Sequence, residues 1–287
     1  KGYYKKPDKY IGLDERPDWN HGCVMALREW LKELSPEEEK KEIPKLDTFD
    51  GKNLFETKFA PINWVVPDLL PSGLSVLASR PKVGKSWFAL GLAKAVSNGL
   101  NFLDRPTIQG DVLYCAFEDG KRRINNRLQM LHFSSNMHFP QFIFDSEDLL
   151  KGFEEQLIDW IKRQNNARLI VIDTLARVKP RTGFSKGTAY DMDNELLSQL
   201  QLLAITSGVC ISFITHLSKA QQDYSFDKIT GSVGLQGMTD AMWLIDRGDN
   251  TPNASITGRG RDIMDFEYSV KWNDLTMTYD FVGNKTE

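Results

Sequence analysis

One short segment restricts the possible folds of this chain: Ser79-Arg80-Pro81-Lys82-Val83-Gly84-Lys85-Ser86-Trp87. It ends in Gly-Lys-Ser, the end of a phosphate-binding P-loop, and this chain has Ser79 where such a loop usually opens with glycine. The apolar run at 74–79 predicts a buried strand, and residues 85–98 carry apolar side chains at helical spacing. Gly99 is expected to end that helix. The sequence therefore predicts a strand, a tight loop and a helix in succession.

A loop of this kind binds phosphate because the start of a helix collects unpaired N–H groups and a partial positive charge. Lys85 would supply an ammonium for the β- and γ-phosphates, and the Ser86 hydroxyl would bind Mg²⁺. We expect all of residues 79–87 to contribute to nucleotide binding, with Ser79 making the first turn without a glycine's freedom at positive φ. The alternative is a structural turn in which Gly-Lys-Ser occurs by chance.

Charge and composition narrow the class of protein. The 287 residues carry a formal net charge of −3, so any contact with nucleic acid would need a local basic patch. No apolar run approaches the roughly 18–20 residues of a membrane helix, and no signal peptide is recognised. The 3 cysteines and 4 histidines show no metal-ligand spacing. Cys115 and Cys210 fall in apolar, strand-like runs and indicate reduced thiols in a cytoplasmic protein.

Two regions are expected along the chain. Residues 1–45 are polar and charged around a short amphipathic helix at 24–34, and form either a docking arm or a peripheral helix. Residues 46–287 alternate strands and helices, which indicates an α/β fold with a mostly parallel sheet and helices on both faces. A β-hairpin around Asn273-Asp274 would close this domain. The expected strands are 74–79, 111–117, 141–145, 169–173, 209–215 and 241–246, and the expected helices are 85–98, 120–131, 150–164 and 189–206.

A carboxylate follows another apolar strand. Residues 169–172 are apolar and Asp173 comes directly after them. Because α/β sheets place ligands at the carboxyl ends of their parallel strands, we expect Asp173 to hold Mg²⁺ through water beside Ser86. An apolar strand that ends in aspartate is a weak signal alone and a strong one behind a P-loop. Thr174 comes next, so the general base must lie elsewhere.

Two further polar residues follow predicted strands. Glu118 is the candidate general base, provided that its strand lies beside the P-loop strand. The alternative is that Glu118 or Asp119 only caps helix 120–131, a role that suits Asp119. His216 ends the next apolar strand after Asp173, where it could sense the γ-phosphate, although a lone histidine is more often structural.

Residues 60–287 resemble a RecA-like P-loop ATPase of the DnaB and plasmid RepA hexameric helicase kind. The resemblance implies that Glu118 is the catalytic glutamate, that His216 is a polar sensor, and that the pair Arg259 and Arg261 reaches the ATP of a neighbouring subunit. It is carried by segments that follow one another in that family's order: "WVVPDLLPSGLSVLASRPKVGKS", "YCAFEDGKRRINNRL", "LIVIDTLARV", "ISFITHLSK", "TGSVGLQGMTDAMWLIDR" and "TGRGRD".

The same resemblance implies ATP and Mg²⁺ as cofactors and a homo-oligomer, as a hexameric ring. The chain departs from the family at Ser79, in place of glycine, and at Arg259, in place of lysine; neither change removes a required chemical group. Two arginines one residue apart on a strand would point the same way, so both could approach one triphosphate. The alternative is that they are solvated or pair with Asp262 or Asp265.

Two long polar stretches, 176–191 and 217–234, are candidates for binding a single strand of nucleic acid. They follow Asp173 and His216 and combine basic residues with glycine and aromatic residues, which suits backbone contact and base stacking. In RecA-like rings the corresponding loops face the central channel. The alternative is an ordinary solvated loop. The residues expected to contact nucleic acid are Lys179, Arg181, Lys186, Lys219 and Lys228.

The function expected from these observations is an ATP-driven motor on single-stranded DNA, a ring-forming replicative helicase of phage or plasmid type. It would work in the cytoplasm, that of the host if a phage or plasmid encodes it. One alternative is a RecA-like ATPase that binds or anneals single strands during recombination. Another is a regulatory ATPase in which ATP switches protein assembly. The expected partners are single-stranded DNA, further copies of the chain, and replication or recombination proteins, with no membrane.

Overall fold

The chain divides into two compact units, Lys1–Phe59 and Ala60–Glu287. In the first unit, the described part contains one short helix, α2 (Gly51–Glu56). The helix expected at 24–34 lies outside the described residues, and a domain boundary after residue 45 stays a prediction. The computed structural model describes residues 48–179, 189–217, 226 and 237–285.

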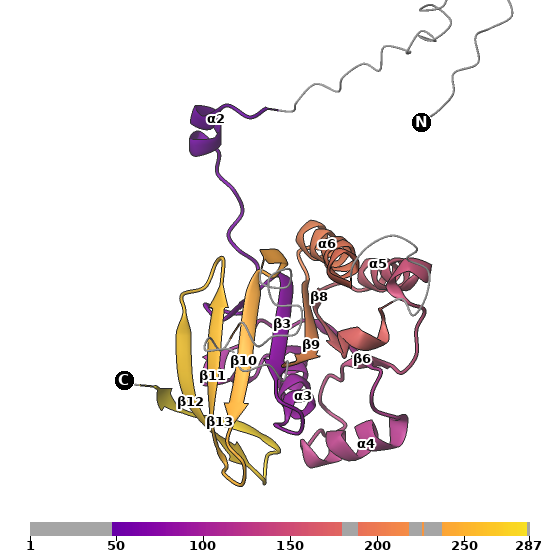
Figure 1. The fold of residues 1–287 in the computed structure, drawn as a ribbon, viewed down its shortest axis with the longest axis vertical. Helices are drawn as coiled ribbons and strands as arrows, with labels where there is room; N and C mark the ends of the chain where they lie inside the picture. Colours follow the sequence, from indigo (N-terminus) through magenta and orange to yellow (C-terminus); the bar gives the residue numbers. More distant parts are fainter. Residues whose placement is uncertain (1–47, 180–188, 218–225, 227–236, 286–287) are drawn as a thin grey trace, which may run out of the picture. The chain divides into compact units, whose positions relative to one another are not determined.

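The second unit is built on one large sheet (Figure 1). Its described strands are β3 (Gly73–Ser79), β6 (Asp111–Ala116), β7 (Gln141–Ile143), β8 (Ala167–Asp173), β9 (Cys210–His216), β10 (Ala241–Arg247), β11 (Asn253–Gly260), β12 (Phe266–Asn273) and β13 (Thr278–Asn284). They follow the order β13-β12-β11-β10-β3-β9-β8-β6-β7. The strands from β10 to β7 pair in parallel, and those from β10 to β13 pair antiparallel. The mostly parallel sheet and the terminal hairpin are therefore confirmed.

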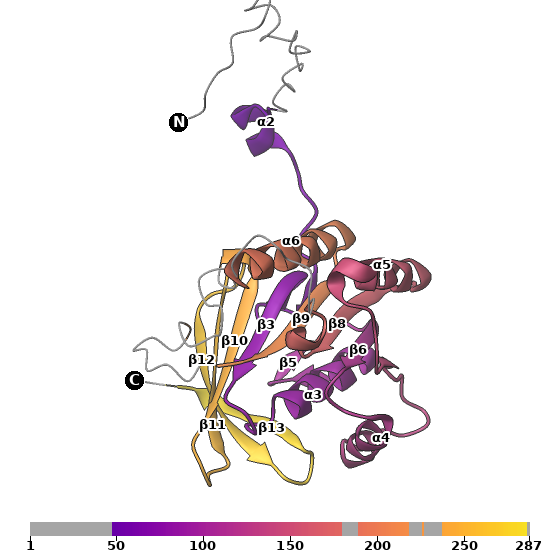
Figure 2. The same ribbon diagram turned by 45° about the vertical axis from the view of Figure 1, so that its right-hand side comes forward.

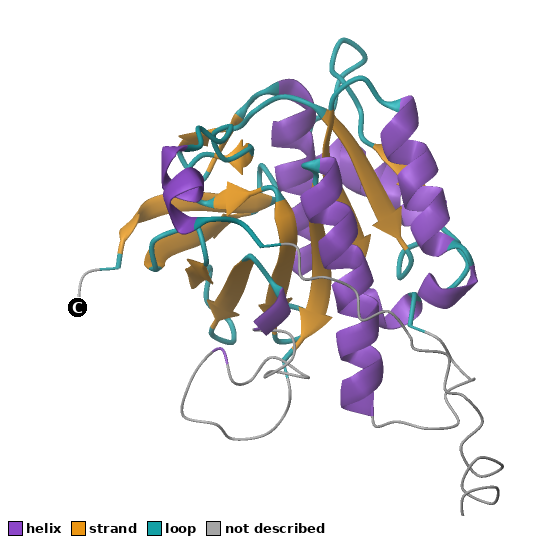
Figure 3. Ribbon diagram, turned by 90° about the horizontal axis from the view of Figure 1, so that it is seen from above, coloured by secondary structure: helices purple, strands orange, loops and turns teal. Residues whose placement is uncertain are grey.

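Helices cover both faces of the parallel strands, as expected (Figures 2 and 3). They are α3 (Lys85–Asn98), α4 (Lys121–Met130), α5 (Phe153–Arg163) and α6 (Ala189–Ser207). One core joins Phe88 of α3 and Ile124 of α4 to Val171 of β8. The other core joins Leu157 of α5 to Ile172, the next residue of β8. Successive residues of β8 enter different cores because side chains alternate along a strand.

Several short elements complete this unit. Two antiparallel pairs are formed by β1 (Trp64–Val66) with β2 (Leu70–Pro71) and by β4 (Asn101–Phe102) with β5 (Arg105–Pro106). The helix expected at 150–164 begins instead as a 3₁₀ turn at Leu149–Lys151. Gly152 then takes a φ of 116°, which an α-helix cannot accommodate, so α5 starts only after it.

Periodicity does not predict β11, because its sequence Asn-Ala-Ser-Ile-Thr-Gly-Arg-Gly is weak in strand-forming residues, although Arg259 and Arg261 were expected to share a strand. It pairs with β10 on one side and with β12 on the other. Gly258 lies opposite Phe266, whose ring occupies the space that a Cβ would need. The absence of a side chain at Gly258 therefore lets the aromatic ring close the sheet.

We predict that Gly258→Ala destabilises the fold by about 1–3 kcal/mol, the usual cost of overpacking. The added methyl group would collide with the ring of Phe266. Urea unfolding followed by tryptophan fluorescence measures the change. Gly51→Ala is the matched control, because a Cβ there meets nothing within 4 Å. Equal stabilities for the two variants would contradict the packing described for β11.

Candidate nucleotide-binding site

The P-loop connects the carboxyl end of β3 to the first turn of α3. Ser79 is the last residue of β3, is completely buried, and its hydroxyl donates to the Arg80 carbonyl at 2.8 Å. Positive φ angles occur later, at Lys82 (65°) and Gly84 (110°). The expectation that Ser79 makes the first turn is therefore wrong. The chain is still extended there, so the position does not need a glycine.

Lys85 lies at the centre of the site. Its ammonium donates to the carbonyls of Ser79 and Arg80, each at 3.2 Å, and to Nδ1 of His216 at 3.1 Å. Ser79 and His216 are register partners on β3 and β9, which explains why the histidine is in reach. The structure thus brings together two residues that the sequence singled out separately.

Burial changes the proton affinity of both groups. It lowers the pKa of Lys85 to about 8, although the charges of Asp173 and Glu118 raise it. The pKa of His216 is also lowered, first by burial and then by the charge of Lys85. The surroundings of Lys85 therefore stabilise its charged form poorly. An anionic ligand would stabilise that form and raise the pKa of Lys85.

Asp173 has the surroundings of a metal-binding carboxylate. It ends β8 and is 2% exposed. The Tyr114 hydroxyl donates to its Oδ2 at 2.8 Å, while its buried Oδ1 has no hydrogen-bond partner among the described residues. Burial raises the pKa of the Asp173 carboxyl, against the opposing effect of the Ser86 and Tyr114 hydroxyls. The unsatisfied oxygen fits an expected contact with water bound to Mg²⁺.

The rest of the magnesium shell would come from outside the protein. In the part of the chain that the structure describes, no group of three His, Cys, Asp or Glu side chains could hold a metal ion. Mg²⁺ usually keeps several waters and binds one or two protein ligands together with substrate phosphates. Two protein ligands, Ser86 and Asp173, would be compatible with such a site, and their role stays a prediction.

Glu118 reaches the site from a strand that does not adjoin the P-loop strand. The expectation for Glu118 required this strand to lie beside the P-loop strand. That requirement is not met, because β9 and β8 lie between β3 and β6. Its exposed side chain nevertheless lies at the same edge of the sheet. The Thr174 hydroxyl donates to its Oε1 at 3.0 Å, and its charge raises the pKa of Lys85. Thr174 is a contact that sequence reasoning missed, and the role of Glu118 as base stays a prediction.

Asp119 does not cap α4. The residue at the N-cap is Gly120, which offers no side-chain hydrogen bond. The buried carboxylate of Asp119 instead forms ion pairs with Arg123 at 2.7 Å and Arg127 at 2.5 Å. The capping alternative is wrong because both oxygens of Asp119 face arginines further along the helix.

The terminal hairpin supports the P-loop, which no pattern in the sequence indicated. The Tyr279 hydroxyl on β13 donates to the Val83 carbonyl at 2.5 Å. Trp272 on β12 packs edge-to-face against both Trp87 and Tyr279, with ring centres 6.4 and 5.1 Å apart. A Cβ on Gly84 would lie 3.6 Å from the ring of Trp272 and 3.6 Å from the hydroxyl of Tyr279. The hairpin therefore packs directly against the loop.

The end of β10 holds the other side of the loop. Arg80 donates to the Arg247 carbonyl at 2.6 Å and lies 3.4 Å from the Asp246 carboxylate. The Arg247 guanidinium lies 5.8 Å from the ring centre of Trp272. A flat cation and an aromatic ring beside a phosphate-binding loop form a surface that can accept a nucleobase. Sequence reasoning missed Arg247 and Trp272 because they lie on β10 and β12, which come together only through β11 between them.

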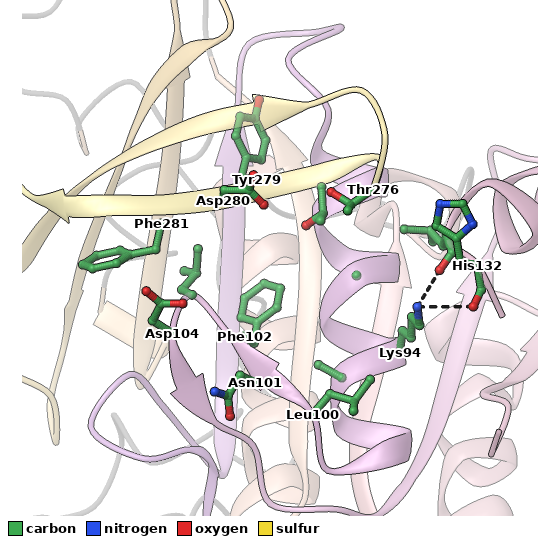
Figure 4. A pocket seen from close by; sticks show the side chains of 15 residues that line it. Lys94, Leu100, Asn101, Phe102, Asp104, His132, Thr276, Tyr279, Asp280 and Phe281 are labelled. Atoms are coloured by element: carbon green, nitrogen blue, oxygen red, sulfur yellow. Dashed lines mark hydrogen bonds between the residues drawn. The ribbon is translucent and has the colours of Figure 1, made fainter.

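A cavity of about 410 Å³ lies alongside α3, and its walls come from α3, the β4–β5 turn and the terminal hairpin (Figure 4). The Lys94 ammonium beside it donates to the carbonyls of Leu131 at 2.5 Å and His132 at 3.5 Å. None of the residues predicted to bind nucleotide lines this cavity. Tyr279 is the link between the two places, because it lines the cavity and bonds to the P-loop.

The two candidate arginines lie far from their own P-loop. Arg259 on β11 is opposite Met242, which is itself opposite Val76 of β3, three residues before Ser79. Arg261 follows the end of β11 rather than lying on it. Arg259 is therefore level with the middle of β3 and Arg261 with its amino end, whereas the P-loop leaves its carboxyl end.

Each arginine has its own acidic partner. The Arg259 guanidinium pairs with Asp265 at 2.8 Å and lies 5.2 Å from the ring centre of Phe226. Arg261 pairs with Asp240 at 3.3 Å. The pairing that we considered as an alternative is thus present for Arg259. For Arg261 the partner comes from the start of β10, not from the adjacent Asp262.

Most of the residues expected to bind nucleic acid lie outside the described part of the chain: Arg181, Lys186, Lys219 and Lys228. Lys179 is described and half-buried, close to the carboxyl end of β8. Nearby Arg177 donates through Nε to the Phe117 carbonyl at 3.1 Å. Arg177 therefore has a structural contact, and a role for Lys179 in binding nucleic acid stays a prediction.

We predict that Tyr279→Phe weakens nucleotide binding about 5- to 10-fold, which corresponds to the loss of one hydrogen bond of roughly 1 kcal/mol. The Val83 carbonyl would lose its donor, and the P-loop would be held less firmly. Titration with a fluorescent ATP analogue measures the affinity. Tyr268→Phe is the matched control, since that tyrosine lies on β12 and contacts Arg105. Unchanged affinity in Tyr279→Phe would rule out support of the loop by this hydroxyl.

We also predict that ATP binding takes up a proton above pH 8. The pKa of Lys85 is about 8 without ligand, and phosphate charges would raise it. Below pH 8, Lys85 is already protonated and its charge contributes fully to ATP binding. Above pH 8, Lys85 is mostly neutral in the free protein, so ATP must bind together with a proton. Calorimetry at pH 8.5 in two buffers of different ionisation enthalpy measures the uptake. Identical heats in the two buffers would contradict the prediction.

Comparison with known proteins agrees with this site. The model of the AAA domain family matches residues 38–222. Among solved structures, an ATPase domain has 16% identity and a TM-score of 0.59, and the match covers 74% of this chain and 85% of that one. A DnaB-like replicative helicase, solved for its interactions with primase, has 15% identity and a TM-score of 0.59, with 91% and 72% covered. These two likenesses concern the fold. The chain belongs to the AAA domain family and is a P-loop ATPase with a RecA-like core.

Proposed function

We propose that this protein is an ATP-driven motor on single-stranded DNA, a ring-forming replicative helicase of phage or plasmid type. The observation that carries the proposal is the separation of Arg259 and Arg261 from the P-loop of their own chain. Arg259 is level with the middle of β3 and Arg261 with its amino end, so these two arginines would act on the nucleotide of a second copy rather than on their own. The fold shared with a DnaB-like replicative helicase supports the same conclusion.

Within one copy, the described residues supply most of the chemistry. Lys85 binds the β- and γ-phosphates, and His216 beside it senses whether the γ-phosphate is present. Glu118 polarises the attacking water, and the Thr174 hydroxyl holds its carboxylate in place. Mg²⁺, held by Ser86 and Asp173, supplies positive charge to the phosphates. The charge that develops on the γ-phosphate still requires a further cation.

That cation comes from a neighbouring copy in this proposal. Arg261 lies level with Leu74, five residues before the end of β3, which is roughly 16 Å along the strand at about 3.3 Å per residue. An arginine cannot span that distance to its own nucleotide. The side chains of Arg259 and Arg261 are 41% and 52% exposed, so both can meet another copy. Head-to-tail contacts of this kind close into rings or continue as filaments.

Exposed apolar side chains in the first unit support assembly. Leu54 and Phe55 of α2 are 50% and 90% exposed, and the flanking Phe49 and Phe59 are 70% and 68% exposed. No described residue of α2 itself is buried, and large apolar side chains of this kind favour a covering contact. A second copy of the chain is the partner that a ring supplies.

The DNA would bind at the edge of the sheet where the nucleotide lies. The segments that follow β8 and β9 both start there, next to Asp173 and His216. A change in the contacts of Asp173 and His216 with the phosphates would therefore alter the position of the first residues of both segments. Lys179 and the basic residues that follow would contact the DNA backbone.

A cytoplasmic location fits the state of the cysteines. Cys115 and Cys210 are free and buried, and burial raises the pKa of both thiols, that of Cys210 to about 12. Such thiols are unreactive, as expected for a reducing compartment. Among the described residues, no helix has the length and apolarity to cross a membrane.

The decisive experiment measures ATP turnover with and without single-stranded DNA, and then strand displacement on a forked duplex. A helicase shows stimulation by single strands and ATP-dependent unwinding. Stimulation without unwinding would favour a recombination or annealing ATPase, and absence of any effect of DNA would favour a regulatory switch. Particle size with an ATP analogue shows whether a ring forms.

We predict that Glu118→Gln binds ATP but turns it over at least about 100-fold more slowly, the scale of general-base loss. Arg261→Ala should be nearly inactive too, since an arginine finger contributes about 10³–10⁵ in rate. In a mixture of the two variants some interfaces unite an intact Glu118 with an intact Arg261. Part of the activity should therefore return on mixing.

The control for this experiment is Lys85→Ala mixed with Glu118→Gln, because both changes damage the same side of the interface and no mixed interface is intact. Normal turnover of Arg261→Ala alone would disprove the trans role of that residue. An active monomer would disprove it as well.

A further inference from the structure

Asp240 joins the strand that carries the P-loop to the segment that carries Arg261. Its backbone N–H donates to the Leu74 carbonyl at 2.7 Å, and its Oδ2 accepts from the Leu74 N–H at 2.8 Å. On its other side, its carbonyl accepts from the Arg261 N–H at 2.9 Å and its Oδ1 from Arg261 Nη1 at 3.3 Å. Asp240 thus uses both backbone and side chain on each neighbour.

The contact is tightly built. Asp240 is 8% exposed, and both strands approach it through glycine. A Cβ on Gly73, which has a φ of 114°, would collide with Oδ2 of Asp240. A Cβ on Gly260 would collide with the Asp240 carbonyl and crowd Ala241. The carboxylate of this ion pair is buried and bonded to the backbone, so it holds one side of the half-exposed Arg261 more firmly than a fully exposed carboxylate would.

Arg261 is held by contacts within its own chain, and part of its side chain is exposed. Its Nη2 donates to the Gly237 carbonyl at 2.6 Å, in addition to the contact of Nη1 with Asp240. A guanidinium carries five N–H donors, so these contacts leave donors for a ligand. With a side chain 52% exposed, those donors can meet a phosphate. The geometry is that of a cation pre-positioned for an anion from outside the chain.

We propose that Asp240 is a positioning residue. It orients Arg261 toward the nucleotide of a neighbouring copy and fixes that orientation relative to β3 of its own copy. This inference rests on the proposed trans role of Arg261. β3 is buried along its whole length and begins at Gly73, next to the residue that Asp240 binds. Because β3 is paired on both sides, Asp240 holds Arg261 at a set position relative to the P-loop of its own copy.

The test is Asp240→Asn in the full chain. Asparagine has the same shape and keeps an oxygen for the Leu74 N–H, but it loses the charge that holds Arg261. We expect the kcat for ATP in the assembled protein to fall by about 10- to 100-fold, the effect of a misplaced catalytic group. The KM should change less than about threefold, since the cis nucleotide site is intact. Asp262→Asn is the matched control, an adjacent carboxylate that does not pair with Arg261, and it should keep normal turnover.

Two readouts separate positioning from structural damage. Mixing Asp240→Asn with Lys85→Ala should restore part of the turnover, because some interfaces then unite an intact P-loop with a well-held Arg261. In an Arg261→Ala background, Asp240→Asn should cause no further loss. Binding of a fluorescent ATP analogue checks the fold. If Asp240→Asn does not bind it, Asp240→Ser is the second variant, since its hydroxyl can still accept from Leu74.

The outcomes distinguish this inference from the proposed function. Normal turnover of Asp240→Asn, with Arg261→Ala inactive, would overturn the role of Asp240 and leave the trans role of Arg261 standing. Loss of turnover without recovery on mixing would also overturn it. Normal turnover of Arg261→Ala would remove the trans role and this inference together.

Discussion

The buried strand β3 is the element on which the rest of the molecule depends. All 7 of its residues are buried, and it pairs in parallel with β9 on one side and β10 on the other. Its carboxyl end leads into the P-loop, and Asp240 binds it at Leu74, near its amino end. A strand paired on both sides cannot shift alone without breaking backbone hydrogen bonds in a water-free interior. The positions of the phosphate site and of Arg261 are therefore set by one rigid support.

The nucleotide site concentrates charge that its surroundings stabilise poorly. Burial lowers the pKa of Lys85 and raises that of Asp173, so each charged form is disfavoured by desolvation. Removing charge from water is costly unless a partner compensates. Their hydrogen bonds go to groups such as His216 and Tyr114, and the carboxylates near Lys85 do not offset the effect of its burial. In the proposed function, a nucleotide with its metal ion would supply the missing opposite charges.

The antiparallel strands have two separate roles. β12 and β13 hold the P-loop through Trp272 and Tyr279, next to the carboxyl end of β3. β11 runs away from that loop and carries Arg259 toward the other end of the sheet. The same hairpin extension thus supports one nucleotide site and presents cations that cannot reach it. That division of tasks is coherent only if copies of the chain work together, as proposed.

The sequence by itself determined the parallel half of the fold and the identity of the phosphate loop, because periodicity and short motifs such as Gly84-Lys85-Ser86 are local properties. It did not reveal β11, whose glycines carry no strand pattern. Only the tertiary structure decided that two strands separate Glu118 from β3, that Tyr279 holds the P-loop, and that Asp240 holds Arg261. These facts depend on strand order and register, which bring together residues that are remote in the chain and share no local pattern.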